Sequence, residues 1–221
     1  MKVLLFGASG MVGQGVLREC LRDPAVTQVI AAGRTPLGKS DPKLSDLIVK
    51  DFFDYSALES QLRGFDACFF CLGVSSVGMS EADYKRVSYD LPLAAATVLA
   101  RLNPQMTFTF VTGRGCDSTE RGPIMWARVK GAAENALLKL PFKAAFMFRP
   151  GIIQPLHGVR SKTPLYNAAY VVLAPVLGLW RVLSPDGLTT SERVGKAMLA
   201  VARHGAPSPW IEMADINRLG A

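Results

Sequence analysis

A glycine-rich segment near the start of the chain constrains the fold more than any other feature. It reads Gly7, Ala8, Ser9, Gly10, Met11, Val12 and Gly13. The apolar run Val3–Phe6 precedes it and the amphipathic stretch Met11–Arg22 follows, so the setting is strand, turn and helix. Such a turn needs glycine where it bends, where its backbone approaches a phosphate and where helix packs on strand. The GxxGxxG spacing therefore predicts a phosphate-binding loop; a glycine-rich turn without a ligand is the alternative.

The rest of the chain alternates short apolar runs with longer helical patterns, as βαβ units around a parallel sheet do. The further strands expected are Gln28–Ala32, Asp46–Lys50, Ala67–Leu72, Thr107–Thr112, Ala144–Phe148 and Trp210–Met213. The further helices expected are Tyr55–Leu62, one capped by Ser80 that restarts near Pro92 and runs to Leu102, Pro123–Leu140, Leu165–Leu183 and Ser191–His204. The predicted fold class is α/β, a doubly wound Rossmann-type parallel sheet with helices on both faces.

Length and composition fit one domain. The chain has 221 residues, of which 49% are hydrophobic and 19% charged, and this balance excludes a disordered chain. Four cysteines exclude a disulfide scaffold. We expect a dinucleotide-binding core over residues 1–150 and a small substrate-side portion over 151–221 that does not fold independently. The start lacks the pattern of a secretory signal, which predicts a cytoplasmic location.

The net charge of +7 belongs to the second half of the chain. Residues 111–221 hold 14 basic and 7 acidic side chains, and residues 121–181 hold nine basic side chains against Glu134 alone. This excess predicts a local anionic substrate, interface or membrane patch. Nucleic acid is not expected as a partner, because no recognisable reading motif accompanies the charge.

The residue after the second expected strand bears on the choice of nucleotide. An acidic residue about 20 positions past the glycine loop would bind a ribose 2′-hydroxyl and select NAD. Here Arg34 stands at that place with no acid nearby, which favours NADP, because a guanidinium can bind a 2′-phosphate. A solvated surface arginine is the alternative. Asp51 and Phe52 close the third expected strand, where the edge of an adenine is often met.

These features together resemble the short-chain dehydrogenase/reductase superfamily, in its atypical and extended branch with NmrA-like and Tat-interacting-protein-like oxidoreductases. The resemblance rests on the glycine loop, Gly33-Arg34, Cys71-Leu72-Gly73, Val87-Ser88-Tyr89-Asp90 and Arg149-Pro150-Gly151, and it covers nearly the whole chain. It implies a Rossmann fold and a bound nicotinamide cofactor. It also implies that Leu72, Gly73, Pro150 and Gly151 border that cofactor.

The usual chemistry of this family implies a Tyr-x-x-x-Lys pair on a helix and a Ser or Thr at the end of the preceding strand. The matching positions are Trp126, Lys130 and Thr112. The resemblance implies that Lys130 holds the nicotinamide ribose, and Thr112 is the candidate for polarising a substrate; an ordinary strand-end threonine is the alternative. An indole N–H does not titrate in the relevant range, so Trp126 cannot be a general acid.

Because Trp126 stands where the family has its tyrosine, two functions are open. The first is an NADP-dependent reductase that acts without the usual tyrosine on a small substrate, anionic or conjugated, which takes its proton from solvent. The second is a non-catalytic NADP-binding protein that serves as a redox-responsive regulator or assembly partner.

The remaining candidates have simpler readings beside the functional ones. His157 is a possible proton donor over the nicotinamide or a loop residue. Cys68 and Cys71 form a CxxC, but residues i and i+3 of a strand face opposite ways, so two packed thiols are expected and no metal site. Cys116, in the loop after the fifth expected strand, is the one thiol expected to be exposed near the cofactor.

Residues 163–183 carry aromatic and apolar side chains at helical spacing. They include Tyr166, Tyr170 and Trp180, with Arg160, Lys162 and Arg181 as basic neighbours. The stretch predicts a helix that covers the site or fills a subunit interface, and peripheral membrane contact is the alternative. The oligomeric state is left open.

Overall fold

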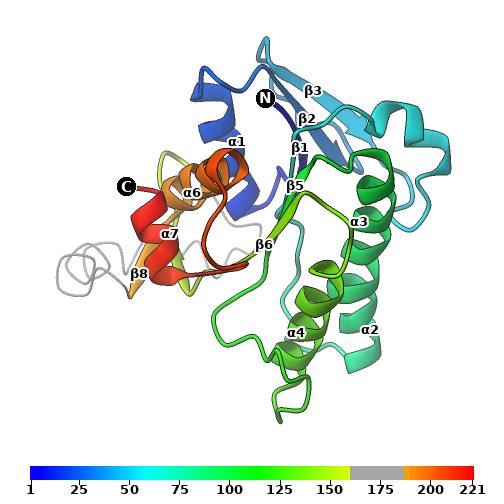
Figure 1. Ribbon diagram of the computed structural model, residues 1–221, viewed down its shortest axis with the longest axis vertical. Helices are drawn as coiled ribbons and strands as arrows, with labels where there is room; N and C mark the ends of the chain where they lie inside the picture. Colours follow the sequence, from blue (N-terminus) through cyan, green and yellow to red (C-terminus); the bar gives the residue numbers. More distant parts are fainter. Residues whose placement is uncertain (160–186) are drawn as a thin grey trace.

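The computed structural model describes residues 1–159 and 187–221 (Figure 1). The first half contains β1 (Lys2–Phe6), α1 (Met11–Arg22), β2 (Gln28–Gly33), β3 (Leu44–Ile48), the 3₁₀ helix η1 (Ser56–Leu62), β4 (Ala67–Phe70), α2 (Glu81–Lys85), the π-helical turn η2 (Arg86–Asp90), α3 (Leu91–Leu102) and β5 (Thr107–Val111). The second half contains α4 (Met125–Leu137), β6 (Ala144–Arg149), β7 (Ile152–Gln154), β8 (Leu188–Thr190), α6 (Ser191–His204), β9 (Trp210–Glu212) and α7 (Met213–Leu219).

The main sheet confirms the predicted fold class. Seven strands lie in the order β3-β2-β1-β4-β5-β6-β9, and every pair is parallel. Helices α1, α6 and α7 lie on one side of the sheet, and α2, α3 and α4 lie on the other (Figure 1). Because all strands run the same way, the glycine loop after β1 and the turns after β4, β5 and β6 lie at one edge of the sheet.

Two apolar clusters fill the space between the sheet and its two helical layers. Successive side chains of a strand point to opposite faces, so Leu4 and Phe6 enter one cluster while Val3 and Leu5 enter the other. The same alternation separates Cys68 from Cys71. The prediction of two packed thiols on opposite faces is therefore confirmed.

The predicted helix restart near Pro92 is a π-helical turn within one helical run. Residues 81–102 are helical throughout, and Pro92 lies in the first turn of α3, directly after η2. A π-helical turn interrupts the regular i→i−4 ladder, so the missing N–H of a proline is tolerated there. Strand β3 begins at Leu44, two residues before the predicted start, because Leu44 pairs with Val29 of β2.

In the described residues after β6, three short elements occur that the sequence did not predict. β7 and β8 form a separate parallel pair, in which Ile153 lies opposite Thr189. The predicted strand Trp210–Met213 ends at Glu212, because Glu212 and Asp215 form a capping box that starts α7 at Met213.

The predicted helix Leu165–Leu183 lies outside the described residues. Among the helices of residues 1–159 and 187–221, none is long and apolar enough to cross a membrane.

Candidate nucleotide-binding site

The glycine loop adopts a geometry that only glycine permits at two of its positions. Gly7 has φ +77°, and a Cβ there would lie 2.7 Å from the carbonyl carbon of Cys71 and from the main-chain nitrogen of Leu72. A Cβ on Gly13 would lie 2.1 Å from the carbonyl oxygen of Gly7. The Gly10 N–H donates to that same carbonyl at 2.9 Å and closes the turn. The loop thus holds α1 directly against β1 and β4.

The helix that follows presents its first turn without a side-chain cap. Gly10 is the N-cap of α1, with extended backbone and no capping side-chain hydrogen bond. Ala8 is buried and Ser9 is exposed. A Cβ on Gly73, just after β4, would meet no atom within 4 Å. The start of α1 and the turn after β4 therefore leave room for a phosphate-bearing ligand at this edge of the sheet.

The residues predicted to meet the adenosine part lie around the ends of β2 and β3. Arg34 is exposed directly after β2. Phe52 packs edge-on against Phe6, with ring centroids 6.2 Å apart, and belongs to the core. The carboxylate of Asp51 accepts from the Phe53 N–H at 2.8 Å. The cofactor-binding roles of these residues stay predictions.

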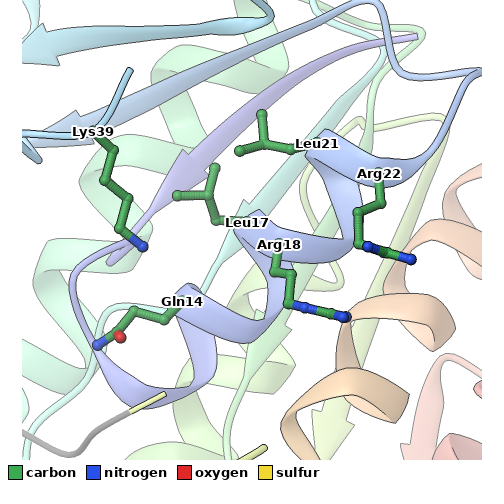
Figure 2. A pocket seen from close by; sticks show the side chains of 6 residues that line it. All are labelled: Gln14, Leu17, Arg18, Leu21, Arg22 and Lys39. Atoms are coloured by element: carbon green, nitrogen blue, oxygen red, sulfur yellow. The ribbon is translucent and has the colours of Figure 1, made fainter. Parts of the chain in front are cut away.

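A cavity of about 300 Å³ lies beside α1 and the connection between β2 and β3 (Figure 2). Its lining consists of Gln14, Leu17, Arg18, Leu21, Arg22 and Lys39. The floor is apolar and the rim is cationic, and no acidic residue is among these six. Gln14 marks the end next to the glycine loop, where its amide donates to the Ser9 carbonyl at 3.0 Å. Sequence reasoning missed Arg18 and Lys39, although the i, i+4 spacing of Gln14, Arg18 and Arg22 places them on one face of α1.

Lys130 and Thr112 are brought together at the end of β5. The Lys130 ammonium donates to the Thr112 carbonyl at 2.7 Å. Burial lowers the pKa of Lys130, and the charges of Cys116 and Glu134 act in the opposite direction. The Thr112 hydroxyl is buried and donates to Glu134 Oε1 at 2.6 Å, with the Phe148 carbonyl 3.1 Å away. The hydroxyl proton of Thr112 is therefore hydrogen-bonded to a buried carboxylate, and the predicted contact of Thr112 with a substrate stays a prediction.

Trp126 lies one helical turn before Lys130, where the family pattern has its tyrosine. Its ring is half-buried, and Cη2 lies 3.7 Å from the position of a Cβ on Gly115. The Arg114 N–H donates to the Pro150 carbonyl at 2.9 Å, which joins the turns after β5 and β6. Arg114 Cδ lies 3.7 Å from the position of a Cβ on Gly151. The residues predicted from α4 and from the turn after β6 thus adjoin the same edge of the sheet.

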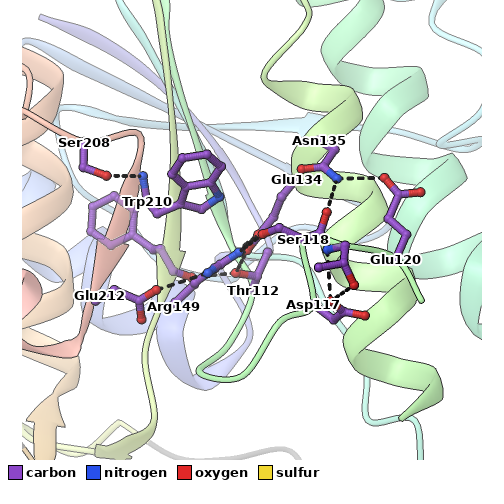
Figure 3. A network of polar contacts seen from close by, with 12 residues as sticks. Thr112, Asp117, Ser118, Glu120, Glu134, Asn135, Arg149, Ser208, Trp210 and Glu212 are labelled. Carbon is purple, nitrogen blue, oxygen red and sulfur yellow. Dashed lines mark hydrogen bonds and ion pairs between the residues drawn. The ribbon is translucent and has the colours of Figure 1, made fainter. Parts of the chain in front are cut away.

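A polar network connects these segments below that edge (Figure 3). Glu134 is fully buried, and its carboxylate accepts from Arg149 Nε at 3.1 Å to each oxygen and forms an ion pair with Arg149 Nη2. Arg149 also donates to Ser118 Oγ at 2.7 Å and pairs with Glu212 at 3.2 Å. These contacts raise the pKa of Arg149 above its usual value, chiefly through Glu134. Sequence reasoning treated Glu134 only as a lone acid in a basic segment and did not find this network.

His157 contacts an acidic side chain, and Cys116 is buried rather than exposed as the sequence predicted. His157 has φ +58°, and its Nε2 lies 2.6 Å from Glu192 Oε2 at the start of α6. Cys116 is buried, and desolvation raises its pKa to about 11. Over residues 1–159 and 187–221, no group of three or more His, Cys, Asp or Glu side chains is placed to hold a metal ion. Residues 163–183, with Tyr166, Tyr170 and Trp180, lie outside the described part of the chain.

Comparison with known proteins yields distant relatives with a consistent fold. No protein-family model matches the chain. Protein HTATIP2 of Rattus norvegicus is 28% identical over 153 residues, which cover 68% of this chain and 62% of the rat protein. Leucinostatins biosynthesis cluster protein T of Purpureocillium lilacinum is 28% identical over 63% of this chain and 52% of its own length. The match thus spans less than two thirds of the length of each of these two relatives. Protein fmp52, mitochondrial, of Emericella nidulans is 29% identical over 88% of this chain and 84% of its own length.

Solved structures give the same answer for the fold. Gre2 of Candida albicans in complex with NADPH superposes with a TM-score of 0.71 at 15% identity, over 96% of this chain and 77% of Gre2. The short-chain dehydrogenase/reductase YIR035C of Saccharomyces cerevisiae gives 0.69 at 13% identity, over 100% and 99% of the two chains.

The seven-stranded parallel sheet and its glycine loop define a Rossmann-type fold of the NAD(P)-binding oxidoreductases. Within that class, these relatives and solved structures support the resemblance of the chain to the atypical short-chain dehydrogenase/reductases. The prediction of a cytoplasmic location is wrong by the same comparison, because the fungal relatives called fmp52 are named as mitochondrial proteins. The absence of a secretory signal does not distinguish these two locations.

Proposed function

We propose that the protein is an NADP-dependent reductase that transfers hydride to a small substrate without a general-acid tyrosine. The observation that carries this proposal is the glycine loop, in which a Cβ on Gly13 would collide with the Gly7 carbonyl. That geometry brings the start of α1 to the edge of the sheet where a pyrophosphate would lie.

The residues present fit a nicotinamide nucleotide. Gly7, Gly10 and Gly13 would hold the pyrophosphate, and Lys130 would hold the nicotinamide ribose at the opposite end of the site. Arg34, with Lys39 beyond it, supplies positive charge beside the adenosine ribose, which supports NADP rather than NAD. Arg18 is already paired with Glu19 and Glu192. Gre2, described in complex with NADPH, shares the fold, but MoeE5, described in complex with UDP-glucose and NAD, shares it too.

In this proposal the residues of the chain orient the nicotinamide and the substrate for hydride transfer. A bound NADPH supplies the hydride, and the turn after β6 with Pro150 and Gly151 would shape the nicotinamide pocket. Trp126 cannot give up a proton in the relevant pH range, so we propose a conjugated or otherwise activated substrate that takes its proton from solvent. The described residues of the substrate-side portion, 151–159 and 187–221, would border that substrate. The basic surplus of the second half supports an anionic substrate.

One observation favours a second candidate function. Trp126 replaces the titrating tyrosine, and the Thr112 hydroxyl donates to Glu134. A protein with this arrangement can bind NADP without turning it over. We therefore keep a non-catalytic, redox-responsive regulator as the alternative.

Two measurements decide between these functions. Titration calorimetry with NADPH and NADH should show binding of NADPH in both cases, and no binding of either nucleotide would contradict both. Loss of NADPH absorbance with quinones, flavins or conjugated aldehydes would support the reductase. Tight binding with no turnover across such a panel would favour the regulator.

A further inference from the structure

We infer that Glu134, held by Arg149, positions Lys130 for a bound nicotinamide nucleotide, acting through Thr112 and through its own negative charge. This inference rests on the proposed function, because it assigns a role to a residue of the same site. Glu134 would not touch the nucleotide itself and is therefore a positioning residue.

The geometry joins Lys130 to Glu134 by way of one residue. The two side chains are one helical turn apart on α4, so they lie on the same face of the helix. Both reach Thr112, Lys130 at the main-chain carbonyl and Glu134 at the hydroxyl. Thr112 is therefore fixed at two points. Hydrogen bonds from Lys130 to Thr112 and from Thr112 to Glu134 hold the lysine side chain in one orientation.

Arg149 holds the carboxylate that anchors this path. Glu134 is buried, and a buried carboxylate is costly unless a charge partner and hydrogen bonds satisfy it. Arg149 provides both through Nε and Nη2. Its other terminal nitrogen, Nη1, pairs with Glu212 at the protein surface. Because Arg149 directly precedes Pro150, the same ion pair also fixes the turn that adjoins the nicotinamide side of the site.

Glu134 supplies the negative charge that acts on the pKa of Lys130 at neutral pH. Among the described residues, Cys116 and Glu134 are the groups whose negative charge opposes the effect of burial on the pKa of Lys130. Burial raises the pKa of Cys116 to about 11, so its thiol is neutral near pH 7. Tyr84 of α2 borders Cys116, and burial raises its pKa as well. At neutral pH this leaves Glu134 to favour the ammonium form of Lys130.

If the Glu134–Arg149 ion pair were purely structural, it would be buried and hydrogen-bonded in the same way but would not change the pKa of Lys130. The experiment therefore measures the protonation of Lys130 directly. Limiting acetic anhydride is added to the nucleotide-free protein between pH 7 and 11, and mass spectrometry follows acetylation of the Lys130 peptide. Glu134→Gln removes the charge but keeps an oxygen that can accept from Thr112. The double variant Glu134→Gln/Arg149→Met removes both buried charges, so it leaves no unpaired buried charge if the single variant does not fold.

The matched control is Glu120→Gln. Glu120 is exposed and accepts from Asn135 of α4 at 2.7 Å, so this variant removes a carboxylate near the same helix without touching Thr112. We expect the acetylation midpoint of Lys130 to fall by about one pH unit in Glu134→Gln, a tenfold change in proton affinity, and to stay unchanged in the control. In the double variant it should fall by less, because loss of the Arg149 cation acts in the opposite direction. An unchanged midpoint in the double variant would overturn the inference.

Calorimetry with NADPH at pH 7 and pH 9.5 links this effect to the proposed function. The double variant should lose more affinity at pH 9.5 than at pH 7, relative to the native chain, because its lysine loses its charge at a lower pH. A lowered midpoint with native affinity at both pH values would overturn the positioning role. No binding of NADPH by the native chain would instead overturn the proposed function, and with it the role of Glu134 toward a nucleotide.

Discussion

Gly13 of α1 faces the carbonyl oxygen of Gly7 so closely that a Cβ on Gly13 would lie 2.1 Å from that oxygen. No side chain fits in this space. The contact fixes how near α1 approaches β1, and with it the position of the helix start relative to any phosphate.

Gly13→Ala should therefore damage both stability and binding. Relief of the clash requires movement of backbone rather than of a flexible side chain, so we expect a loss of about 2 kcal/mol or more in urea unfolding. Gly73→Ala is the matched control, because its Cβ would meet no atom within 4 Å, and its stability should stay within about 0.5 kcal/mol of native. Equal stability of the two variants would contradict this account of the loop.

Arg34→Ala should change the choice of nucleotide. If Arg34 binds the 2′-phosphate, its removal lowers NADPH affinity by about tenfold or more and leaves NADH affinity nearly unchanged, because a hydrogen-bonded charge contact is worth about 1.5–3 kcal/mol. Calorimetry with both nucleotides measures the ratio. An unchanged NADPH/NADH ratio would show that Arg34 is a solvated surface arginine.

Trp126 offers a test of the proton source. Trp126→Phe removes the indole N–H, and we expect turnover of a conjugated substrate to change by less than about threefold, since the proton comes from solvent. Trp126→Tyr places a phenol one turn before Lys130 and should raise the rate with simple carbonyl substrates. Loss of activity in Trp126→Phe on the order of a hundredfold would assign a direct role to the indole.

Cys116 should be slow to react with alkylating reagents. Its pKa of about 11, raised chiefly by burial, leaves on the order of one thiol in a thousand ionised at pH 8, and the thiolate is the reactive form. Iodoacetamide labelling at pH 8, followed by mass spectrometry, should modify Cys116 only after unfolding in urea. Labelling of the folded protein at the rate of the unfolded chain would contradict this prediction.

Glu192 should make the protein sensitive to acid. Its pKa is lowered to about 2, chiefly by the contact with His157 and then by Lys196. A lowered pKa gives stability that is present above the unfolded-state value near 4.5 and is lost as the pH falls toward 2. Because the pair is partly exposed, Glu192→Gln should cost about 1 kcal/mol at pH 6 and nothing near pH 2. Urea unfolding at both pH values measures this, and a constant difference would disprove it.

Local patterns predicted the regular elements well where periodicity and end signals agreed. The bounds of α1 and α6 are those expected, since an amphipathic stretch with clear ends needs little from the rest of the chain. The pattern failed for β7, β8 and α7. Two three-residue strands show no usable period, and α7 starts at a capping box that only the neighbouring strand brings into place.

The candidate site divides in the same way. The glycine loop, Arg34 and the Trp126–Lys130 spacing are visible in the sequence, because each lies within one turn or one helix. The contacts of Thr112 and Arg149 with Glu134 are not, because the three residues come from β5, β6 and α4. By itself the sequence determined a Rossmann-type fold and the glycine loop between β1 and α1. Only the tertiary structure decided which buried charges stand behind Lys130, since parallel strands bring together ends that are distant along the chain.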